Sequence, residues 1–403
     1  MSALKYWIWL STLRGIGAAT AVKLLDKMGT PENIFFADKD TYIASGISQK
    51  EAECLSDKSL GRAMSVMDKC KEIGVRMLTL GDAEYPERLK NIFDPPVVLY
   101  IKGNLPVMDE EAAIAVAGTR NCTPYGIKTS ERMGYELARN GCVVVSGLAR
   151  GIDSAAAKGA LRAGGKVVGV LGCGIDIVYP PENIRLFDDV AAIGAIISEY
   201  PPGTEVNGRF FPARNRILSG ISAGVVIIEA PKKSGSLITA SRALEQGRDV
   251  FAVPANADSI ASEGSNLLIK DGAIPVLSGK DVADEYRHIY PDKLTDGREL
   301  IPITPKAEKK LLEEELSDKK QKLKAVKKII DKQKSEDYDL KKRAIELTED
   351  EKKVCEAIGT ECIHVNDIIE RSALPAGKVL AVLTILEIKG AVSQETGKTF
   401  RLS

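Results

Sequence analysis

Histidine is almost missing from this chain of 403 residues, which contains only His288 and His364. Both lie outside the region where glycine-rich motifs gather, so we expect neither a histidine-based catalytic triad nor a histidine-rich metal site. Paired cysteines are missing too, because the seven cysteines are an odd, scattered set without a CxxC motif. This pattern fits neither a disulfide framework nor a zinc knuckle, and we interpret the cysteines as small, buried, reduced residues.

Net charge is also absent, since 56 basic and 56 acidic side chains cancel at pH 7. A chain without a global positive field can bind nucleic acid only through a local cluster of cations. Long apolar runs are missing as well, because the apolar N-terminal stretch is soon interrupted by Arg14. That stretch is too short for a signal peptide or a membrane-spanning helix, so the sequence predicts a cytosolic protein without membrane contact.

The chain is long enough for one large core with smaller modules beside it. Short amphipathic runs broken by glycines predict a helical domain over residues 1–81, and an α/β pattern follows over residues 82–290. Dense Lys and Glu with apolar residues at roughly heptad spacing predict a charged helical linker over residues 291–346. A single solvated helix and a short coiled coil are both compatible with that spacing. Three helical runs and a hairpin over residues 347–403 predict a winged helix.

An apolar strand, a glycine-rich turn and an amphipathic helix alternate several times between residues 112 and 277. Continuous apolar runs such as VVVS and VVII suit strands that helices cover on both faces. The sequence therefore predicts an α/β fold with a doubly wound, mostly parallel sheet. The expected strands are Ile114–Ala117, Val143–Ser146, Val167–Leu171, Ala195–Ser198, Val225–Glu229 and Val250–Val253, preceded by an apolar strand at Val97–Ile101.

Polar turns follow most of these strands, and they read GTRN, SGLARGID, LGCGID, FFPARNR, EAPKKSGSLITA and EGSN. In an open doubly wound sheet the ligand crevice lies outside the carboxyl ends of the strands, where helix N-termini offer N–H groups to anions. Glycines in such turns let the backbone approach a phosphate closely, although any one of them could serve only to make a tight turn. The cations of the turns would gather along one edge, which suits a polyanion that runs across the crevice.

The candidate phosphate- and DNA-binding residues are Gly118, Thr119, Arg120, Ser146, Gly147, Arg150, Gly151, Asp153, Phe211, Arg214, Asn215, Arg216, Lys233, Ser234, Gly235, Ser236, Thr239 and Asn266. Phe210 and Phe211 beside cations are typical of a site that stacks a base and neutralises phosphates, but either ring could equally belong to the core. Arg216 has an alternative role as a structural cation paired with Glu229 or Asp153.

Enzyme motifs are missing from the places where this fold would carry them. The first strand leads into GTRNCTPYG instead of GxGxxG, and there is no GxxxxGK[ST] loop, so neither a nicotinamide enzyme nor an NTPase is supported. The alternative to strand binding is a nucleotide-binding sensor or a nucleotide N-glycosidic hydrolase, with Glu229 and Asp153 as acidic groups. SGSLITA lacks the carboxylate of the GGxGTxxE pattern that such enzymes show, so we expect no catalytic residue. Because nucleotide-cofactor motifs and a histidine- or cysteine-based metal site are also missing, we expect no cofactor or metal.

The motifs GTR, SGLARGIDSAAAKGAL, FFPARNR, SGSLITA and GSN occur in this order after YPERLKNIFDPPVVLYIKGN. With them, residues 85–277 resemble the DNA-processing protein A family, also called Smf or DprA. The resemblance implies a Rossmann-like domain that binds single-stranded DNA and delivers it to a RecA-class recombinase in natural transformation, usually as a homodimer. It also implies that Arg120 contacts a phosphate and that Gly147, Gly151 and Arg216 line the same pocket.

Two flanking segments also resemble known modules. LRGIGAATAVKLL looks like a helix-hairpin-helix segment, in which Gly15 and Gly17 could present amides to a DNA phosphate unless the domain binds protein instead. LPAGKVLAVLTILEIKGAV is similar to the winged helix of some family members. Its expected recognition helix, Gly377–Lys389, has few basic residues, which favours protein contact at least as much as groove reading. A third alternative is therefore an interaction scaffold that uses the linker and the winged helix.

Overall fold

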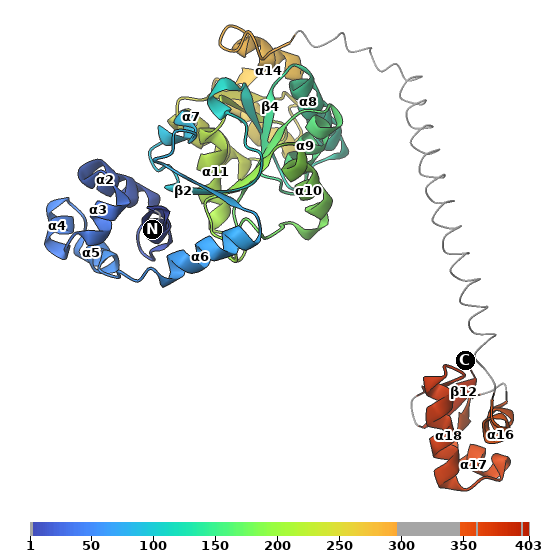
Figure 1. Cartoon of the computed structure of the whole chain (residues 1–403). Coiled ribbons are helices and arrows are strands. Elements are labelled where there is room, and N and C mark those ends of the chain that lie inside the picture. The colour runs from blue at the N-terminus through green and yellow to red at the C-terminus, as the bar shows by residue number, and fades with distance from the viewer. Residues whose placement is uncertain (1–2, 296–346, 360–361, 396–397, 403) are drawn as a thin grey trace. The chain divides into compact units, whose positions relative to one another are not determined.

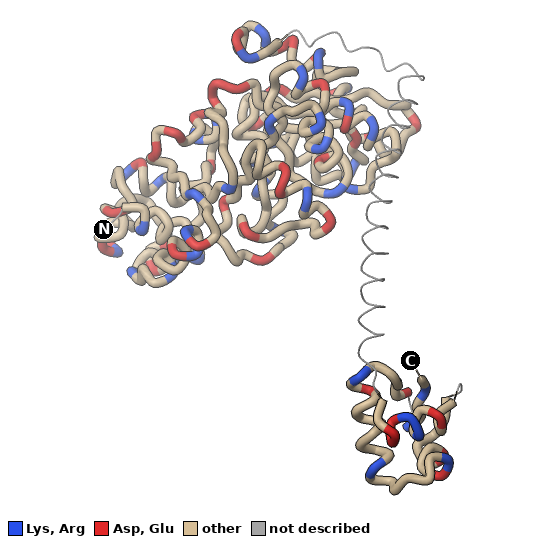
Figure 2. The backbone as a smooth tube through the Cα atoms, turned by 45° about the vertical axis from the view of Figure 1, so that its right-hand side comes forward, with Lys and Arg blue, Asp and Glu red and all other residues tan. Residues whose placement is uncertain are grey.

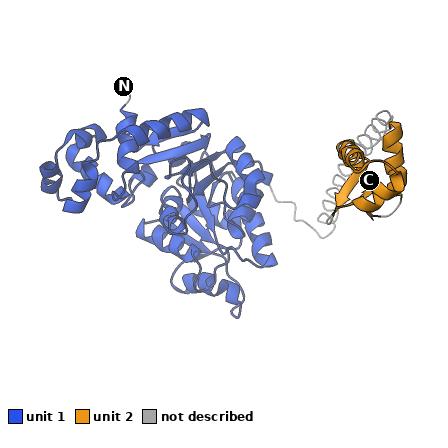
Figure 3. Cartoon of the chain, turned by 90° about the horizontal axis from the view of Figure 1, so that it is seen from below, with its two compact units in different colours: residues 1–300 blue, residues 301–403 orange. Residues whose placement is uncertain are grey.

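The computed structural model describes residues 3–295, 347–359, 362–395 and 398–402 (Figure 1). The chain divides into two compact units, residues 1–300 and 301–403 (Figure 3). Apart from its first five residues, the predicted charged linker lies outside the described residues. In the part of the chain that is described, no helix combines the length and the apolarity that a membrane span needs.

Short helices open the first unit, and three of them have side-chain caps. Thr30 accepts a hydrogen bond from the Asn33 amide with Pro31 directly after it, and Ser48 forms a capping box with Glu51. Trp9 and its apolar neighbours pack into the same core as one face of the sheet. The helices are α1 (Leu4–Thr12), α2 (Ala18–Met28), α3 (Pro31–Phe36), α4 (Lys39–Ala44), α5 (Gln49–Leu55) and α6 (Gly61–Glu72).

A sheet of nine strands forms the centre of the first unit, in the order β1-β2-β6-β5-β4-β3-β7-β8-β9. The strands from β6 to β9 in this order run parallel, and β2 pairs antiparallel with β1 and β6. The mostly parallel sheet confirms the predicted fold class. Its strands are β1 (Arg76–Thr79), β2 (Val98–Gly103), β3 (Ala113–Ala117), β4 (Val143–Ser146), β5 (Val167–Leu171), β6 (Ala195–Ser198), β7 (Gly224–Ile227), β8 (Asp249–Ala252) and β9 (Ile274–Pro275).

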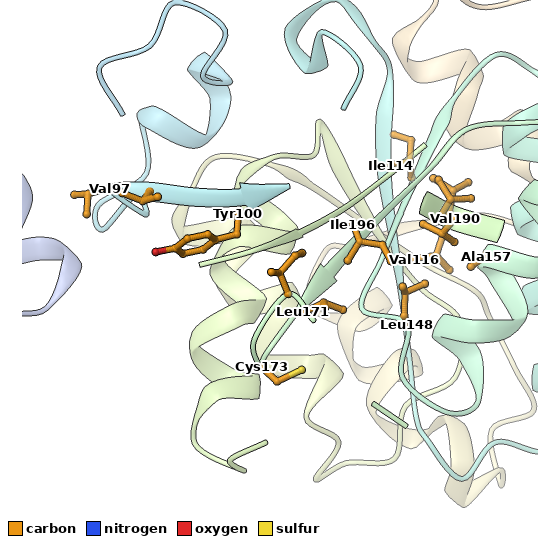
Figure 4. Packing of buried hydrophobic residues seen from close by; sticks show 14 of the residues in the cluster. Val97, Tyr100, Ile114, Val116, Leu148, Ala157, Leu171, Cys173, Val190 and Ile196 are labelled. Atoms are coloured by element: carbon orange, nitrogen blue, oxygen red, sulfur yellow. The ribbon is translucent and has the colours of Figure 1, made fainter. Parts of the chain in front are cut away.

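Helices cover both faces of this sheet. Successive side chains of a strand point to opposite faces, so Ile114 and Val116 of β3 join one core while Ala113 and Ala115 join the other. Figure 4 shows part of the first core. On that face lie α8 (Pro124–Arg139), α9 (Ile152–Arg162), α10 (Ile184–Ile193) and α14 (Gly279–Tyr286); on the other lie α7 (Glu87–Lys90), α11 (Phe210–Gly220), α12 (Ser236–Glu245) and α13 (Glu263–Lys270).

The FFPARNR motif is helical, so the prediction that it forms a turn is wrong. Its first residue, Phe210, opens α11. Pro212 is compatible with this start because the N–H groups of a first helical turn have no partner inside the helix. The EGSN motif likewise begins a helix, α13.

The second unit is a winged helix, as predicted. Its core contains residues of all three helices and Phe400 of the wing. A short strand adds to the predicted elements, since β10 pairs with β12 in a three-stranded sheet. The expected turn at Thr396 and Gly397 lies outside the described residues. The elements are α16 (Glu349–Ile358), β10 (Ile363–His364), α17 (Val365–Ser372), α18 (Ala376–Ile388), β11 (Val392–Glu395) and β12 (Thr399–Leu402).

Helices α8 and α9 touch backbone to backbone at two glycines. A Cβ on Gly134 would overlap the carbonyl oxygen of Ala156, and a Cβ on Gly159 would overlap that of Glu131. We expect Gly159→Ala to lower the free energy of unfolding by about 1–3 kcal/mol, because the helices must separate. Denaturant unfolding measures this, with Gly208→Ala as the control, since a Cβ there meets nothing within 4 Å. Equal stability of the two variants would contradict the close packing.

Candidate nucleic-acid interface

A cavity of about 390 Å³ opens at the carboxyl ends of β3 and β7, and we call it the β3–β7 cavity. β3 is the first parallel strand in the chain, and later strands add on both of its sides. The loop after β3 leads to α8 on one face of the sheet, whereas the loop after β7 leads to α12 on the other. The loops therefore diverge and leave a crevice, which is where open α/β sheets bind ligands.

The structure brings most of the predicted site residues together in this cavity. They come from the loop after β3, from the first turns of α9 and α11, and from the turn that opens α12. The predicted residues that line it are Gly118, Thr119, Arg120, Asp153, Phe211, Arg214, Asn215, Lys233, Ser234, Gly235, Ser236 and Thr239. Sequence reasoning missed several apolar lining residues, such as Ala149, Leu218 and Ile238, because an apolar side chain next to a polar turn carries no signal for a site.

Two exposed cations, Arg120 and Lys233, face this cavity. The Arg120 guanidinium lies 4.8 Å from the centre of the Phe211 ring, a cation–π arrangement. Neither cation forms a salt bridge with a described residue, in contrast to Lys232, which pairs with Glu263. Arg120 and Lys233 are therefore available to an anion.

Arg214 is a cation of a different kind, because it is buried beneath the cavity with a relative exposure of 4%. Its guanidinium donates hydrogen bonds to the carbonyl oxygens of Gly147, at 3.0 Å, and of Val170. These carbonyls belong to the ends of β4 and β5, so Arg214 ties the start of α11 to the sheet. An added Cβ on Gly147 would lie 2.5 Å from Arg214 Nη2 and from Asp153 Oδ2, so this position has room only for glycine.

Asp153, at the start of α9, is the buried carboxylate next to Arg214. Burial raises the pKa of Asp153, while the positive charges of Arg214 and Arg120 and the backbone N–H groups of Gly118 and Ala149 lower it. Burial also lowers the pKa of Arg214, which the charge of Asp153 opposes. Because each of these two charges favours the ionised form of the other, we assign both groups as ionised, although no salt bridge or hydrogen bond joins them.

Three predicted residues lie in the wall of the cavity without lining it. The buried Ser146 hydroxyl donates to the backbone oxygen of Asp153 at 2.9 Å. Gly151 has a φ of +79°, and a Cβ there would lie 2.5 Å from the carbonyl oxygen of Thr119. Gly147 makes room for the buried charges, as described above. These residues shape the cavity, and the sequence could not separate that role from ligand contact.

Arg216 does not share a cavity with Arg120, so that expectation is wrong. Arg216 lies in a separate cavity of about 390 Å³, where it pairs with Glu199 at 2.6 Å and Asp94 at 3.0 Å. The alternative of a structural cation is correct in kind, but Glu229 was the wrong partner, as was Asp153. The helix explains the separation, because two residues along α11 correspond to roughly 200° of rotation, which points Arg214 and Arg216 apart.

Two further candidates lie outside the β3–β7 cavity. Arg150 is exposed and forms a salt bridge with Glu182. Asn266 uses its side-chain amide to accept from the Ala255 N–H and to donate to the Ala255 carbonyl. Both side chains have partners within the protein that a one-dimensional motif could not reveal.

Glu229 is also engaged by the protein itself. Its buried carboxylate accepts hydrogen bonds from the N–H and the hydroxyl of Thr123, both at 2.8 Å, and its backbone oxygen accepts from the Thr119 N–H. It thereby fixes the loop between β3 and α8. Asp153 is buried and accepts from the backbone N–H groups of Gly118 and Ala149, so both acidic groups considered for hydrolysis interact with the protein itself.

Metal-ligating side chains and cysteine thiols are the next candidates for chemistry. Within the described ranges, no group of three or more His, Cys, Asp or Glu side chains could hold a metal ion. All seven cysteines are free; Cys70, Cys142 and Cys173 are buried. The prediction of buried cysteines is wrong for Cys362, which is exposed.

Substitution of the two arginines of the cavity should change the free energy of unfolding by very different amounts. Arg214→Met leaves the carbonyl groups of Gly147 and Val170 buried without their donor and removes a positive charge that favours ionised Asp153, so we expect a loss of about 3 kcal/mol in the free energy of unfolding. Arg120→Met removes an exposed cation and should change stability by no more than about 0.5 kcal/mol. Urea unfolding of both variants tests this difference. Comparable losses would show that Arg120 is also a structural residue.

Comparison with known proteins adds independent information. The DNA recombination-mediator protein A family model matches residues 76–287, and the DprA winged helix domain model matches residues 340–398. DNA processing protein DprA of Bacillus subtilis is 41% identical over 220 residues, which are 55% of this chain and 74% of the relative. Protein Smf of Synechocystis is 33% identical over 410 residues, which cover 98% of each chain. The crystal structure of DNA processing protein A from Streptococcus pneumoniae superposes with a TM-score of 0.62 at 36% identity, covering 71% of this chain and 99% of that one.

Proposed function

Because the chain belongs to the DNA recombination-mediator protein A family, whose relatives are named DprA and Smf, we propose that it binds single-stranded DNA in the β3–β7 cavity. The observation that carries this proposal is the pair of exposed cations, Arg120 and Lys233, which line one cavity and form no salt bridge with a described residue. Phosphate groups of a polynucleotide supply the negative charge that would pair with these cations.

The surroundings of the two cations suit a nucleotide chain. Helix α12 begins at Ser236, which lines the cavity, so the positive end of the helix dipole lies at this wall and adds positive potential for a phosphate. The half-buried Phe211 ring supplies an aromatic surface beside the cations, as sites for single strands do. A duplex hides its base faces in the stack, so the aromatic group favours an unpaired strand.

The distribution of charge explains how a neutral chain can serve this function. Basic and acidic residues are interspersed along the backbone of the first unit (Figure 2). Affinity for DNA must therefore come from the local cluster and not from a long-range field. We expect short contacts with few phosphates and a correspondingly moderate dependence on salt.

We further propose that the protein holds the strand and hands it to a RecA-class recombinase, for example during natural transformation. The recombinase is an implication of the family resemblance. Among the described residues, Asp153 is the one carboxylate that lines the β3–β7 cavity, and it is buried and accepts hydrogen bonds from backbone N–H groups. A transfer role without catalysis agrees with these contacts. The free cysteines favour a cytosolic location, where thiols stay reduced.

Salt-dependent binding tests the role of the exposed cations. We expect Arg120→Ala to weaken binding of an oligothymidylate and to lower the slope of log affinity against log salt by about 0.7, the share of one phosphate contact. Lys233→Ala should act in the same direction. Arg150→Ala is the matched control, because Arg150 is an exposed arginine outside the cavity. An unchanged slope in Arg120→Ala, or an equal effect in the control, would remove the proposed contact.

A homodimer is the assembly that we propose for this function. β9 ends the sheet, so the outer edge of this strand has no partner within the described residues. Exposed apolar side chains surround that edge, and a second copy of the chain would cover them. These side chains are Leu244, Ile274 and Leu277, with relative exposures of 62%, 36% and 66%.

Charged substitutions at this edge should separate the dimer. We expect the full chain to sediment as a dimer at micromolar concentration, and the double variant Ile274→Asp with Leu277→Asp to sediment as a monomer, because buried carboxylates would lack partners. Phe36→Asp is the control, since Phe36 is 70% exposed on the helical domain. A monomeric wild-type protein, or a double variant that remains dimeric, would contradict this interface.

A further inference from the structure

A second cavity of about 450 Å³, which we call the β8 cavity, borders the same loop as the β3–β7 cavity. It lies where β7 and β8 end and α8 begins. The loop after β3 contributes Arg120 to the first cavity and Thr123 to the second, while the segment after β7 contributes Pro231 to the first and Glu229 to the second. The two cavities are therefore neighbours along the carboxyl edge of the sheet.

The β8 cavity differs from its neighbour in charge. No cation lines it, and Glu229 is its one charged lining residue among those described. Both oxygens of the Glu229 carboxylate already accept hydrogen bonds from Thr123. A phosphate would find no positive partner in this cavity, so its lining suits a neutral polar group.

Groups that recognise a flat heterocycle are present instead. Tyr125, in the first turn of α8, lines the cavity with 57% of its surface exposed. The side chains of Asn256 and Ser259 also line it, and they form no hydrogen bond with another described side chain or backbone group, although the Asn256 carbonyl accepts from Asn266 and from the Ser259 N–H. An amide offers both a donor and an acceptor, which matches the edge of a nucleobase, and an exposed tyrosine offers a stacking face.

We propose that the β8 cavity binds one unstacked nucleobase of the strand whose phosphates occupy the β3–β7 cavity. This inference rests on the proposed function and deepens it, because it assigns phosphates and a base to separate subsites. Arg120 and Thr123 are three residues apart and can be separated by at most roughly 11 Å of chain, so neighbouring nucleotides reach both cavities. Tyr125 stacks on the base, and Asn256 binds its edge.

The experiment compares two ligands of equal length and charge, an oligothymidylate and an oligomer of abasic sugar phosphates. Fluorescence anisotropy with the full chain should show that Tyr125→Ala binds the oligothymidylate about tenfold more weakly than the wild type, with an unchanged salt slope, because stacking is lost and phosphate contacts remain. The same variant should bind the abasic oligomer like the wild type. Tyr125→Phe should restore binding of the oligothymidylate, and Asn256→Ala should weaken it severalfold.

Phe93→Ala is the matched control, since Phe93 is 87% exposed and lines neither cavity. The base subsite would be overturned if Tyr125→Ala bound the oligothymidylate as tightly as the wild type does, or if it lost equal affinity for the abasic oligomer. Either result would leave the proposed function intact. Failure of the wild-type chain to bind the oligothymidylate at low salt would overturn both. An equal loss in Phe93→Ala would also overturn the subsite, because the effect would then not be specific to the β8 cavity.

Discussion

The loops after β3 and β7 leave the sheet toward opposite faces, and the candidate site depends on that divergence. This divergence follows from the strand order. β3 pairs with β4 on one side and with β7 on the other, and both of these strands come later in the chain. Neighbouring loops that turned to the same face would fill the crevice with backbone. Here the crevice stays open, and residues 90 or more positions apart along the chain, such as Arg120 and Phe211, meet at its rim.

The charged side chains at this edge of the sheet have two different roles, one structural and one in ligand binding. Buried Arg214 ties the start of α11 to the ends of β4 and β5 through two carbonyl groups, and buried Asp153 beside it compensates its charge; desolvation shifts the pKa values of both groups toward the neutral forms. The exposed cations Arg120 and Lys233 form no salt bridge with a described residue. A chain with zero formal charge can thus present a positive site, because these two cations line the same cavity.

The sequence predicted the sheet better than the roles of single residues. β4, β5 and β6 begin and end where the apolar runs do, because strands buried on both faces need such runs. The glycine-rich turns at the cavity were found for a related reason, since close approach of backbone segments requires glycine.

Roles that depend on partners elsewhere in the chain could not be predicted. Arg216 belongs to a different cavity from Arg214 because helical geometry separates them, and its partners Asp94 and Glu199 come from other parts of the sequence. Asn266 is engaged by the backbone of Ala255. No pattern of residue types distinguishes such a side chain from one that waits for a ligand.

Hydrogen–deuterium exchange of the full chain, with and without a saturating oligothymidylate, tests the location of the strand most directly. The account predicts that bound DNA slows exchange of the amides at Gly118–Asn121 and Ser234–Ser236, which border the β3–β7 cavity. Protection confined to the helical domain or to the winged helix, with these two turns unchanged, would contradict it.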